Sequence, residues 1–283
     1  MFKLLAGCFF YLVFSANPYS SISDLKRLPG TVSIGHNICM RQTEVTVHEW
    51  IDFIVNNDFD SSLYPANACL SNSWTRLIFE DLKNKGNFKH LIVSRIPAHQ
   101  SLLSFRLKRD ALSDSLKKTE FVPLSLPITG ITFDQAVKFC KWKEQLFNMD
   151  RDDSKKVQVG LPSIEIYKLV IENIDSISIH SANPCTQFKF NYRHSYCQNK
   201  YLQNSLQGQT ILRVDSYGPT HLNLYCIQGN AAEMTASKGV AMGGSFRHYA
   251  NQSVSSAVQS YSGTENWLGF RYVVTLRTAP AID

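Results

Sequence analysis

Two capped amphipathic helices and two short strand patterns predict that this chain mixes helix and strand. The first helix is expected near residue 47, where apolar side chains recur at i, i+3, i+4 and i+7. Thr46 can cap its first turn, and Glu49 can reach back to that cap. Strands are expected at residues 31–34 and 91–94. The apolar face of the first helix consists of Val47, Trp50, Ile51 and Ile54.

A second capping box, formed by Thr132 and Gln135, predicts a helix that runs to about residue 147. Its apolar face consists of Phe133, Ala136, Val137, Cys140 and Phe147. Residues 58–120 show the weakest patterns, so we expect a loop-rich insertion there, with some helix. We expect that insertion to belong to a single domain over residues 21–283.

The composition predicts a folded protein with no nucleic-acid partner. The 283 residues are 44% hydrophobic and 12% aromatic, which is ample for a packed core. The net charge is +6, and the basic residues are scattered apart from one denser stretch at 106–118. No nucleic-acid-binding motif accompanies that stretch, so we interpret it as a solvated surface.

The first 20 residues have the pattern of an export signal. Lys3 supplies the positive start, residues 4–14 form a short apolar run, and small residues near Ser15 suit cleavage. The apolar run is too short for a comfortable transmembrane helix. Residues 5–8 also spell a lipoprotein box that ends in Cys8. We therefore expect an exported protein of the periplasm or cell envelope, with any membrane attachment made through this N-terminus.

Six cysteines remain after removal of that signal, and an even number in an exported chain permits disulfides. Cys185 and Cys197 flank a short polar, aromatic segment and are the expected pair. The connectivity of the others stays open. Cys140 and Cys226 lie in apolar contexts, where a cysteine also serves as a small buried hydrophobe.

Five sequence blocks together resemble the formylglycine-generating enzyme family, whose domain is also called the sulfatase-modifying-factor domain. Three of them lie at residues 226–235, 242–246 and 268–271, and match Gly-Asn-x-x-Glu, Gly-Gly-Ser-Phe and Gly-Phe-Arg in order. Two further blocks match earlier family patterns through Glu44, Val45, Thr46, Trp50, Phe53, Pro127, Ile128, Ile131, Thr132, Phe133, Ala136, Phe139, Cys140 and Trp142.

A shorter stretch also resembles the family, because Leu161, Pro162 and Ser163 fit and Tyr167 stands where the family usually has Trp. Ile164 and Ile166 replace two family glutamates, which predicts a rebuilt hydrogen-bond network. The resemblance implies an irregular, loop-rich α+β fold related to that of C-type lectins.

The resemblance also suggests that this chain lacks the family's oxidase chemistry. Catalytic members place one cysteine two residues after the aromatic of Gly-Gly-Ser-Phe and a second five residues later. This chain has His248 and Ser253 at those positions. Copper(I) prefers thiolate ligands, so a histidine and a serine are a poor substitute. We expect no copper cofactor; if the chain is an enzyme, His248 and Arg247 are the candidate catalytic residues.

Calcium is the other metal that the resemblance suggests. The Gly-Asn-x-x-Glu block would supply Asn230 and Glu233, whose oxygens suit a hard cation. The alternative is that Asn230 holds a left-handed turn after Gly229 while Glu233 makes an internal hydrogen bond.

We therefore expect a non-catalytic binding or scaffold protein with protein partners in a bacterial envelope assembly. Related family members serve as structural parts of envelope machinery, and loops on a rigid core often carry binding. The candidate contact loops are residues 58–120 and 176–210. One alternative is a divergent enzyme around His248. Another is a calcium-dependent carbohydrate binder, in which Tyr261 and Trp267 could stack on a sugar.

Overall fold

The computed structural model describes residues 28–35, 37–70, 73–84, 88, 91–96, 99–107, 124–178, 190–193, 210–254 and 256–277. The proposed signal at residues 1–20 and the expected Cys185–Cys197 pair lie outside the described residues. Of the two candidate contact loops, the end of the first, residues 108–120, and most of the second, residues 179–189 and 194–209, also lie outside them.

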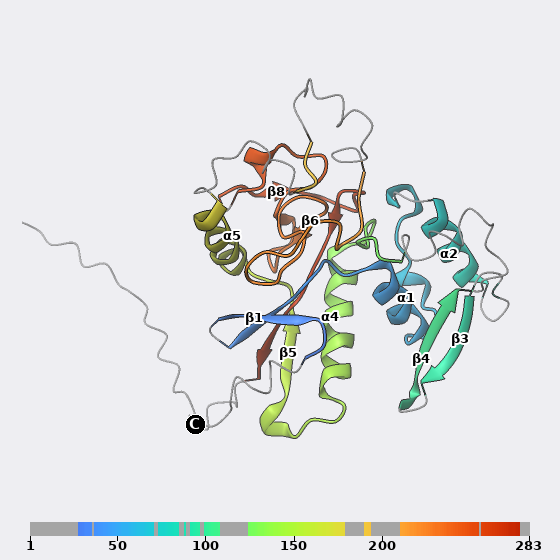
Figure 1. The fold of residues 1–283 in the computed structure, drawn as a ribbon. Helices are drawn as coiled ribbons and strands as arrows, with labels where there is room; N and C mark the ends of the chain where they lie inside the picture. Colours follow the sequence, from blue (N-terminus) through green and yellow to red (C-terminus); the bar gives the residue numbers. More distant parts are fainter. Residues whose placement is uncertain are drawn as a thin grey trace, which may run out of the picture.

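A four-stranded sheet connects the two ends of the described chain. Its order is β1-β2-β10-β5, and β10 is antiparallel to both of its neighbours. The expected strand at residues 31–34 is confirmed as β1. The C-terminal strand therefore lies between a strand from near the N-terminus and one from the middle of the chain, which closes the fold (Figure 1). The strands are β1 (Thr31–Gly35), β2 (Ile38–Arg41), β5 (Val157–Gly160) and β10 (Val273–Leu276).

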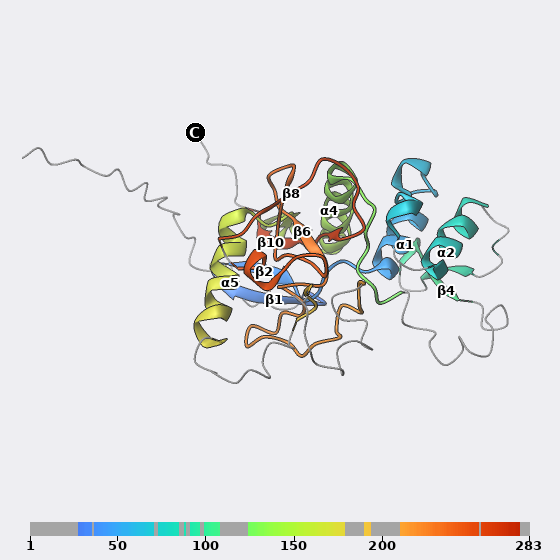
Figure 2. The same cartoon turned by 90° about the horizontal axis from the view of Figure 1, so that it is seen from above.

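Helices cover both faces of this sheet, and the alternation of side chains along the strands explains why. Met40 and Val273 pack in one apolar cluster with α5 (Ile164–Ser178), while Cys39 and Val274 pack in another with α4 (Phe133–Asn148). Successive strand residues point to opposite faces, so one sheet supports both helices. Figure 2 shows α5 and α4 on the two sides of the sheet.

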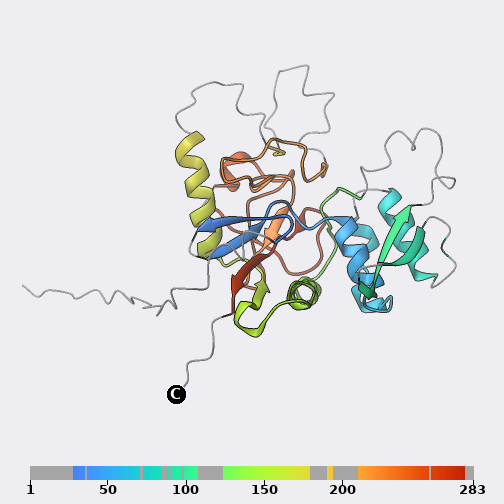
Figure 3. The ribbon, with the colours of Figure 1, turned by 60° about the horizontal axis from the view of Figure 1, so that its bottom comes forward.

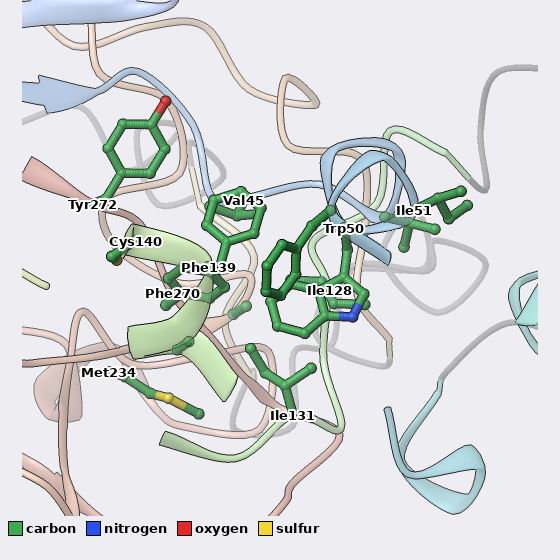
Figure 4. Close-up of a cluster of buried hydrophobic side chains, with 14 of the residues drawn as sticks. Val45, Trp50, Ile51, Ile128, Ile131, Phe139, Cys140, Met234, Phe270 and Tyr272 are labelled. Atoms are coloured by element: carbon green, nitrogen blue, oxygen red, sulfur yellow. The ribbon is translucent and has the colours of Figure 1, made fainter. Parts of the chain in front are cut away.

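The larger apolar cluster is centred on α1 (Val47–Val55) and α4. Both expected capping boxes are present, at Thr46 with Glu49 and at Thr132 with Gln135. Trp50 stacks on Phe139 at 5.6 Å, with other aromatic rings edge-on to them. Figure 4 shows this packing. The predicted apolar stripe of α1 is buried as expected, whereas on α4 the contact is made by Phe139, which the predicted face did not include.

The second sheet has shorter strands and includes residues of all three C-terminal family blocks. Its order is β8-β7-β6-β9, with β9 parallel to β6 and the other pairs antiparallel. The strands are only two or three residues long, and loops join them. They are β6 (Ala232–Met234), β7 (Val240–Met242), β8 (Gln259–Ser260) and β9 (Leu268–Gly269).

Residues 58–120 contain more regular structure than the sequence predicted. After two short 3₁₀ turns, Ser61–Leu63 and Asn67–Cys69, the chain forms α2 (Ser73–Lys83) and a hairpin of β3 (Leu91–Ile96) with β4 (His99–Leu107). The expected strand at 91–94 is confirmed as part of β3. The partner strand was missed because pairing, and not local pattern, selects it. The hairpin and α5 lie at opposite ends of the molecule (Figure 3).

Four cysteines within the described residues are free thiols, namely Cys39, Cys69, Cys140 and Cys226. Cys140 and Cys226 are buried, which confirms the interpretation of these two as small hydrophobes. Among the described residues, no helix is long and apolar enough to cross a membrane. The described part of the fold is therefore held together by packing and hydrogen bonds, without a covalent cross-link.

Candidate functional site

Polar side chains of the family blocks meet in the interior, where Arg271 pairs with Glu233. Arg271 is fully buried, just before β10, and Glu233 is fully buried on β6. Arg271 Nε and Nη2 donate to the two carboxylate oxygens of Glu233, each at 2.6 Å. Such a bidentate pair fixes both side chains in one geometry. Arg271 therefore anchors the start of β10 to β6.

The remaining donors of Arg271 bind main-chain carbonyls. Nη1 donates to the carbonyl oxygens of Arg41 and Gln42, both at 3.1 Å, and Nη2 donates to that of Tyr225 at 2.9 Å. A guanidinium has five N–H donors, and all five are used here. Arg271 therefore links the C-terminal strand to the end of β2 and to the loop before β6.

Tyr167 completes the shell around Glu233. Its hydroxyl donates a hydrogen bond to Glu233 Oε2, and the ring is fully buried. Tyr167 lies where the family usually has Trp. Its phenol therefore adds a hydrogen-bond donor in the segment where the sequence predicted a rebuilt hydrogen-bond network. Ile164 and Ile166 pack against the α5 cluster as apolar side chains. Burial raises the pKa of Glu233, and the charge and hydrogen bonds of Arg271 oppose that rise.

Asn230 is also committed to internal hydrogen bonds. Its φ of +61° confirms the left-handed turn that follows Gly229. Its Oδ1 accepts from Asn191 Nδ2 and from the amide of Leu212, at 3.1 and 2.9 Å. Its Nδ2 donates to Glu44 Oε1 at 2.9 Å and to the carbonyl of Leu212 at 3.1 Å. The side-chain amide therefore uses its full hydrogen-bonding capacity.

Glu44 is the member of this group that the sequence did not single out as a site residue. It is fully buried, and its Oε2 atom has no hydrogen-bond partner. Burial, together with the nearby Glu233 carboxylate, raises the pKa of Glu44 to about 8. Glu44 therefore carries a proton at neutral pH. We call Glu44, Tyr167, Asn230, Glu233 and Arg271 the Arg271 network.

The predicted calcium ligands, Asn230 and Glu233, do lie close together through this network, but their oxygens are already hydrogen-bonded. A calcium ion at Glu233 would have to displace the Arg271 guanidinium. Within the described ranges, no group of three His, Cys, Asp or Glu side chains is arranged to hold a metal. The present geometry does not fit a calcium site at this block, and calcium elsewhere stays a prediction.

His248, the candidate catalytic residue, lies at the surface beside the Gly-Gly-Ser-Phe turn. Its Nδ1 is 2.7 Å from Ser245 Oγ, and its ring packs edge-on against Trp267 at 5.0 Å. Partial burial and the neighbouring Arg247 lower the pKa of His248, so the imidazole is neutral at neutral pH. Ser245 itself is fully buried, which keeps its hydroxyl away from any external substrate.

Ser253, at the second of the two family cysteine positions, faces inward. The residue is fully buried and its Oγ has no hydrogen-bond partner. Gly244, with φ of +69°, lies directly against it: a Cβ at that position would come 1.9 Å from Ser253 Oγ. This close approach requires glycine at residue 244. Ser253 therefore fills the space behind the turn and does not stand beside His248 as an exposed ligand.

Three exposed side chains surround His248. Arg193, Arg247 and Tyr249 are all exposed, and the Arg193 amide donates to the carbonyl of His248 at 3.0 Å. The Arg193 guanidinium lies over the Tyr249 ring at 5.3 Å, and that of Arg247 over the buried Phe246 ring at 5.9 Å. We call Arg193, Arg247, His248 and Tyr249 the arginine rim.

The sequence located the arginine rim only in part. His248 and Arg247 follow the Gly-Gly-Ser-Phe block, so the family pattern pointed to them. Arg193 comes from a distant segment, and no motif marks it. Its position is fixed by the main-chain hydrogen bond to His248, a contact that sequence patterns do not reveal.

The two carbohydrate-stacking candidates do not form one platform with free faces. Trp267 is half-buried and packs against His248. Tyr261 is half-buried against the main apolar cluster, with its hydroxyl buried and without a hydrogen-bond partner. Their packing is the ordinary use of aromatic side chains.

A family model described as the sulfatase-modifying factor enzyme 1-like domain matches residues 19–276. The match covers nearly the whole chain, and the chain belongs to this family of mixed helix-and-sheet domains. The resemblance seen in the five sequence blocks is thereby confirmed. No curated protein matches the chain.

Solved structures give weaker likenesses. PvdO from Pseudomonas aeruginosa is 12% identical, with a TM-score of 0.44 over 84% of this chain and 80% of that one. CarF is 17% identical, with a TM-score of 0.46 over 85% and 87%. Treponema denticola variable protein 1 is 15% identical, with a TM-score of 0.34 over 86% and 90%. The family assignment rests on the sequence match.

Proposed function

We propose that this chain is an exported, non-catalytic binding protein that uses the arginine rim to hold a protein partner in the cell envelope. One observation carries the proposal: the residue at the second family cysteine position, Ser253, is sealed behind Gly244, while the loop around it exposes side chains. The first such position, His248, is hydrogen-bonded to Ser245 and packed on Trp267. These contacts support a scaffold for surface loops.

The chemistry of the residues also favours binding over the family's oxidation. Copper(I) is held by soft thiolates in catalytic members, and an imidazole beside an inward-facing hydroxyl offers no such pair. The loop is instead anchored to the core, which suits the presentation of a fixed contact surface. The N-terminal export pattern supports an envelope location for that surface.

The test is affinity purification of the tagged full-length chain from its native host in mild detergent, followed by sizing and mass spectrometry. We expect stoichiometric recovery in a larger assembly. The Arg247→Ala, Tyr249→Ala variant should lose the partner, whereas His221→Ala, at an exposed histidine outside the rim, should retain it.

Recovery of the wild-type chain as a bare monomer or homo-oligomer would contradict the proposal. In that case the alternative is a divergent enzyme at His248. A His248→Ala variant that folds normally but loses a measurable turnover would establish that alternative.

A further inference from the structure

Two guanidinium groups of the arginine rim have no carboxylate partner. The side chains of Arg193 and Arg247 contact aromatic rings, and no ion pair joins either of them to a described acidic residue. Other surface arginines differ: Arg213 pairs with Asp215 at 2.8 Å, and Arg277 pairs with Glu144 at 2.9 Å. Within the described residues, the guanidinium groups of the rim are therefore left without an acidic partner.

The sequence around the rim strengthens its positive field. No aspartate or glutamate occurs from Met234 to Thr264, and Arg247 lies within this stretch. Lys238, the other cation there, is already paired with Asp134 at 3.1 Å and adds no unpaired charge. Unpaired positive charge on one surface attracts negatively charged ligands and raises their association rate. The rim thus has the charge pattern of an anion-binding surface.

The loop that presents the rim is braced by glutamine side chains. Gln259 Nε2 donates to the carbonyl of Gln252 at 2.5 Å, and Gln259 Oε1 accepts from the amide of Gly244 at 3.2 Å. Gln252 Oε1 accepts from the amide of Tyr249 at 2.9 Å, and Gln228 Nε2 donates to the carbonyl of Ser253 at 3.2 Å. A braced loop loses little conformational entropy on binding.

Stacking also orders the two cationic side chains. A guanidinium over an aromatic ring keeps its edge N–H groups directed away from the ring face, where they can bind a carboxylate in pairs. Arg193 and Arg247 each have such a ring beneath them. They are therefore suited to two acidic groups presented on the two sides of His248.

Apolar side chains lie along the same loop. Tyr249, Val254 and Val258 are 40%, 37% and 52% exposed, and they are three of the large hydrophobic residues that the described surface leaves exposed. Exposed aliphatic side chains favour partners that bring apolar groups of their own. A ligand that carries only charge and hydroxyl groups would leave these valines without a counterpart.

We propose that the arginine rim binds an acidic peptide segment of a partner protein, with carboxylates on Arg193 and Arg247 and apolar side chains against Tyr249, Val254 and Val258. This inference rests on the proposed binding function and adds the chemistry of the partner. The apolar residues favour a peptide over an anionic polysaccharide, the other ligand that would suit two arginines.

The test uses the full mature chain and a fluorescent synthetic peptide in which glutamates alternate with leucines and phenylalanines. We expect binding that weakens as salt rises, because the Debye length falls to about 8 Å at 0.15 M ionic strength. The Arg193→Glu, Arg247→Glu variant should bind about tenfold more weakly or worse. The Lys141→Glu, Lys168→Glu variant has the same net charge, with both changes at exposed helix positions, and should bind normally.

Two peptide controls and one polysaccharide complete the design. A peptide with every glutamate changed to glutamine should not bind, and heparin should bind more weakly than the acidic peptide. The inference falls if the peptide fails to bind, if both charge-reversal variants bind it equally, or if heparin binds and the peptide does not. If the acidic peptide fails to bind while the Arg247→Ala, Tyr249→Ala variant still loses the native partner, the binding function stands and only this inference fails.

Discussion

The Arg271 network and the arginine rim contain the same kind of side chain in opposite settings. In the network, Arg271 is fully buried and all five of its donors are used. In the rim, the guanidinium groups of Arg193 and Arg247 are exposed and rest on rings alone. The family signature therefore fixes the interior of the fold, whereas the rim arginines remain exposed at the surface.

The largest effect on stability is expected in the buried Arg271 network. Arg271→Met leaves the Glu233 carboxylate buried without its partner, and we expect a loss of about 3–5 kcal/mol in the free energy of unfolding. Urea denaturation measures it. Arg277→Met removes an exposed pair and should cost less than about 1 kcal/mol. Equal costs for the two variants would show that the network does not stabilise the fold.

The next largest effect on stability is expected at Gly244, in the turn that covers Ser253. Gly244→Ala would force a left-handed backbone on alanine and drive its Cβ into Ser253, so we expect a loss of at least about 2 kcal/mol. Gly263→Ala is the matched control because no heavy atom lies within 4 Å of its added Cβ. Thermal unfolding compares the two variants. A tolerated Gly244→Ala would mean that Ser253 can move outward.

The pH dependence of stability tests the buried proton on Glu44. Its pKa is about 8 when folded against an ordinary 4.5, so the unfolded chain loses this proton first as the pH rises. Stability should therefore fall between about pH 4.5 and 8, with a slope of up to ~1.4 kcal/mol per pH unit from this group. Above pH 8 the contribution levels off.

Glu44→Gln keeps the acceptor for Asn230 and should flatten that slope in urea titrations at several pH values. Asp52, whose pKa burial raises to about 7, contributes a slope of the same sign at lower pH, between about 4 and 7, and a smaller total because its carboxylate is partly exposed. Asp52→Asn is therefore the comparison variant. An unchanged slope in Glu44→Gln would contradict the assignment of the proton to Glu44.

The smallest effect on stability is expected at the rim. Arg193→Glu with Arg247→Glu changes two exposed side chains that make no ion pair, so the free energy of unfolding should change by less than about 0.5 kcal/mol. The same variant is expected to lose peptide binding. A large loss of stability would instead show that the rim stabilises the fold, as the Arg271 network does.

Local patterns predicted the helices well because capping and periodicity are properties of neighbouring residues. The capping boxes at Thr46 and Thr132 formed as expected, and so did the apolar stripe of α1. Strand β4 was missed because its partner, β3, selects it. The sequence left the pairing of Cys39 and Cys69 open, because the distance between two cysteines cannot be read from sequence.

The sequence by itself determined the family, the starts of α1 and α4 and the candidates His248 and Arg247, because motifs and capping boxes are read along the chain. It did not predict α5. Only the tertiary structure decided that Glu233 meets Arg271 and Tyr167, that Ser253 faces inward, and that Arg193 joins His248. Each of these contacts links segments that are distant in sequence or depends on backbone direction. Burial and hydrogen bonding act between neighbours in space, so their outcome appears only after the chain has folded.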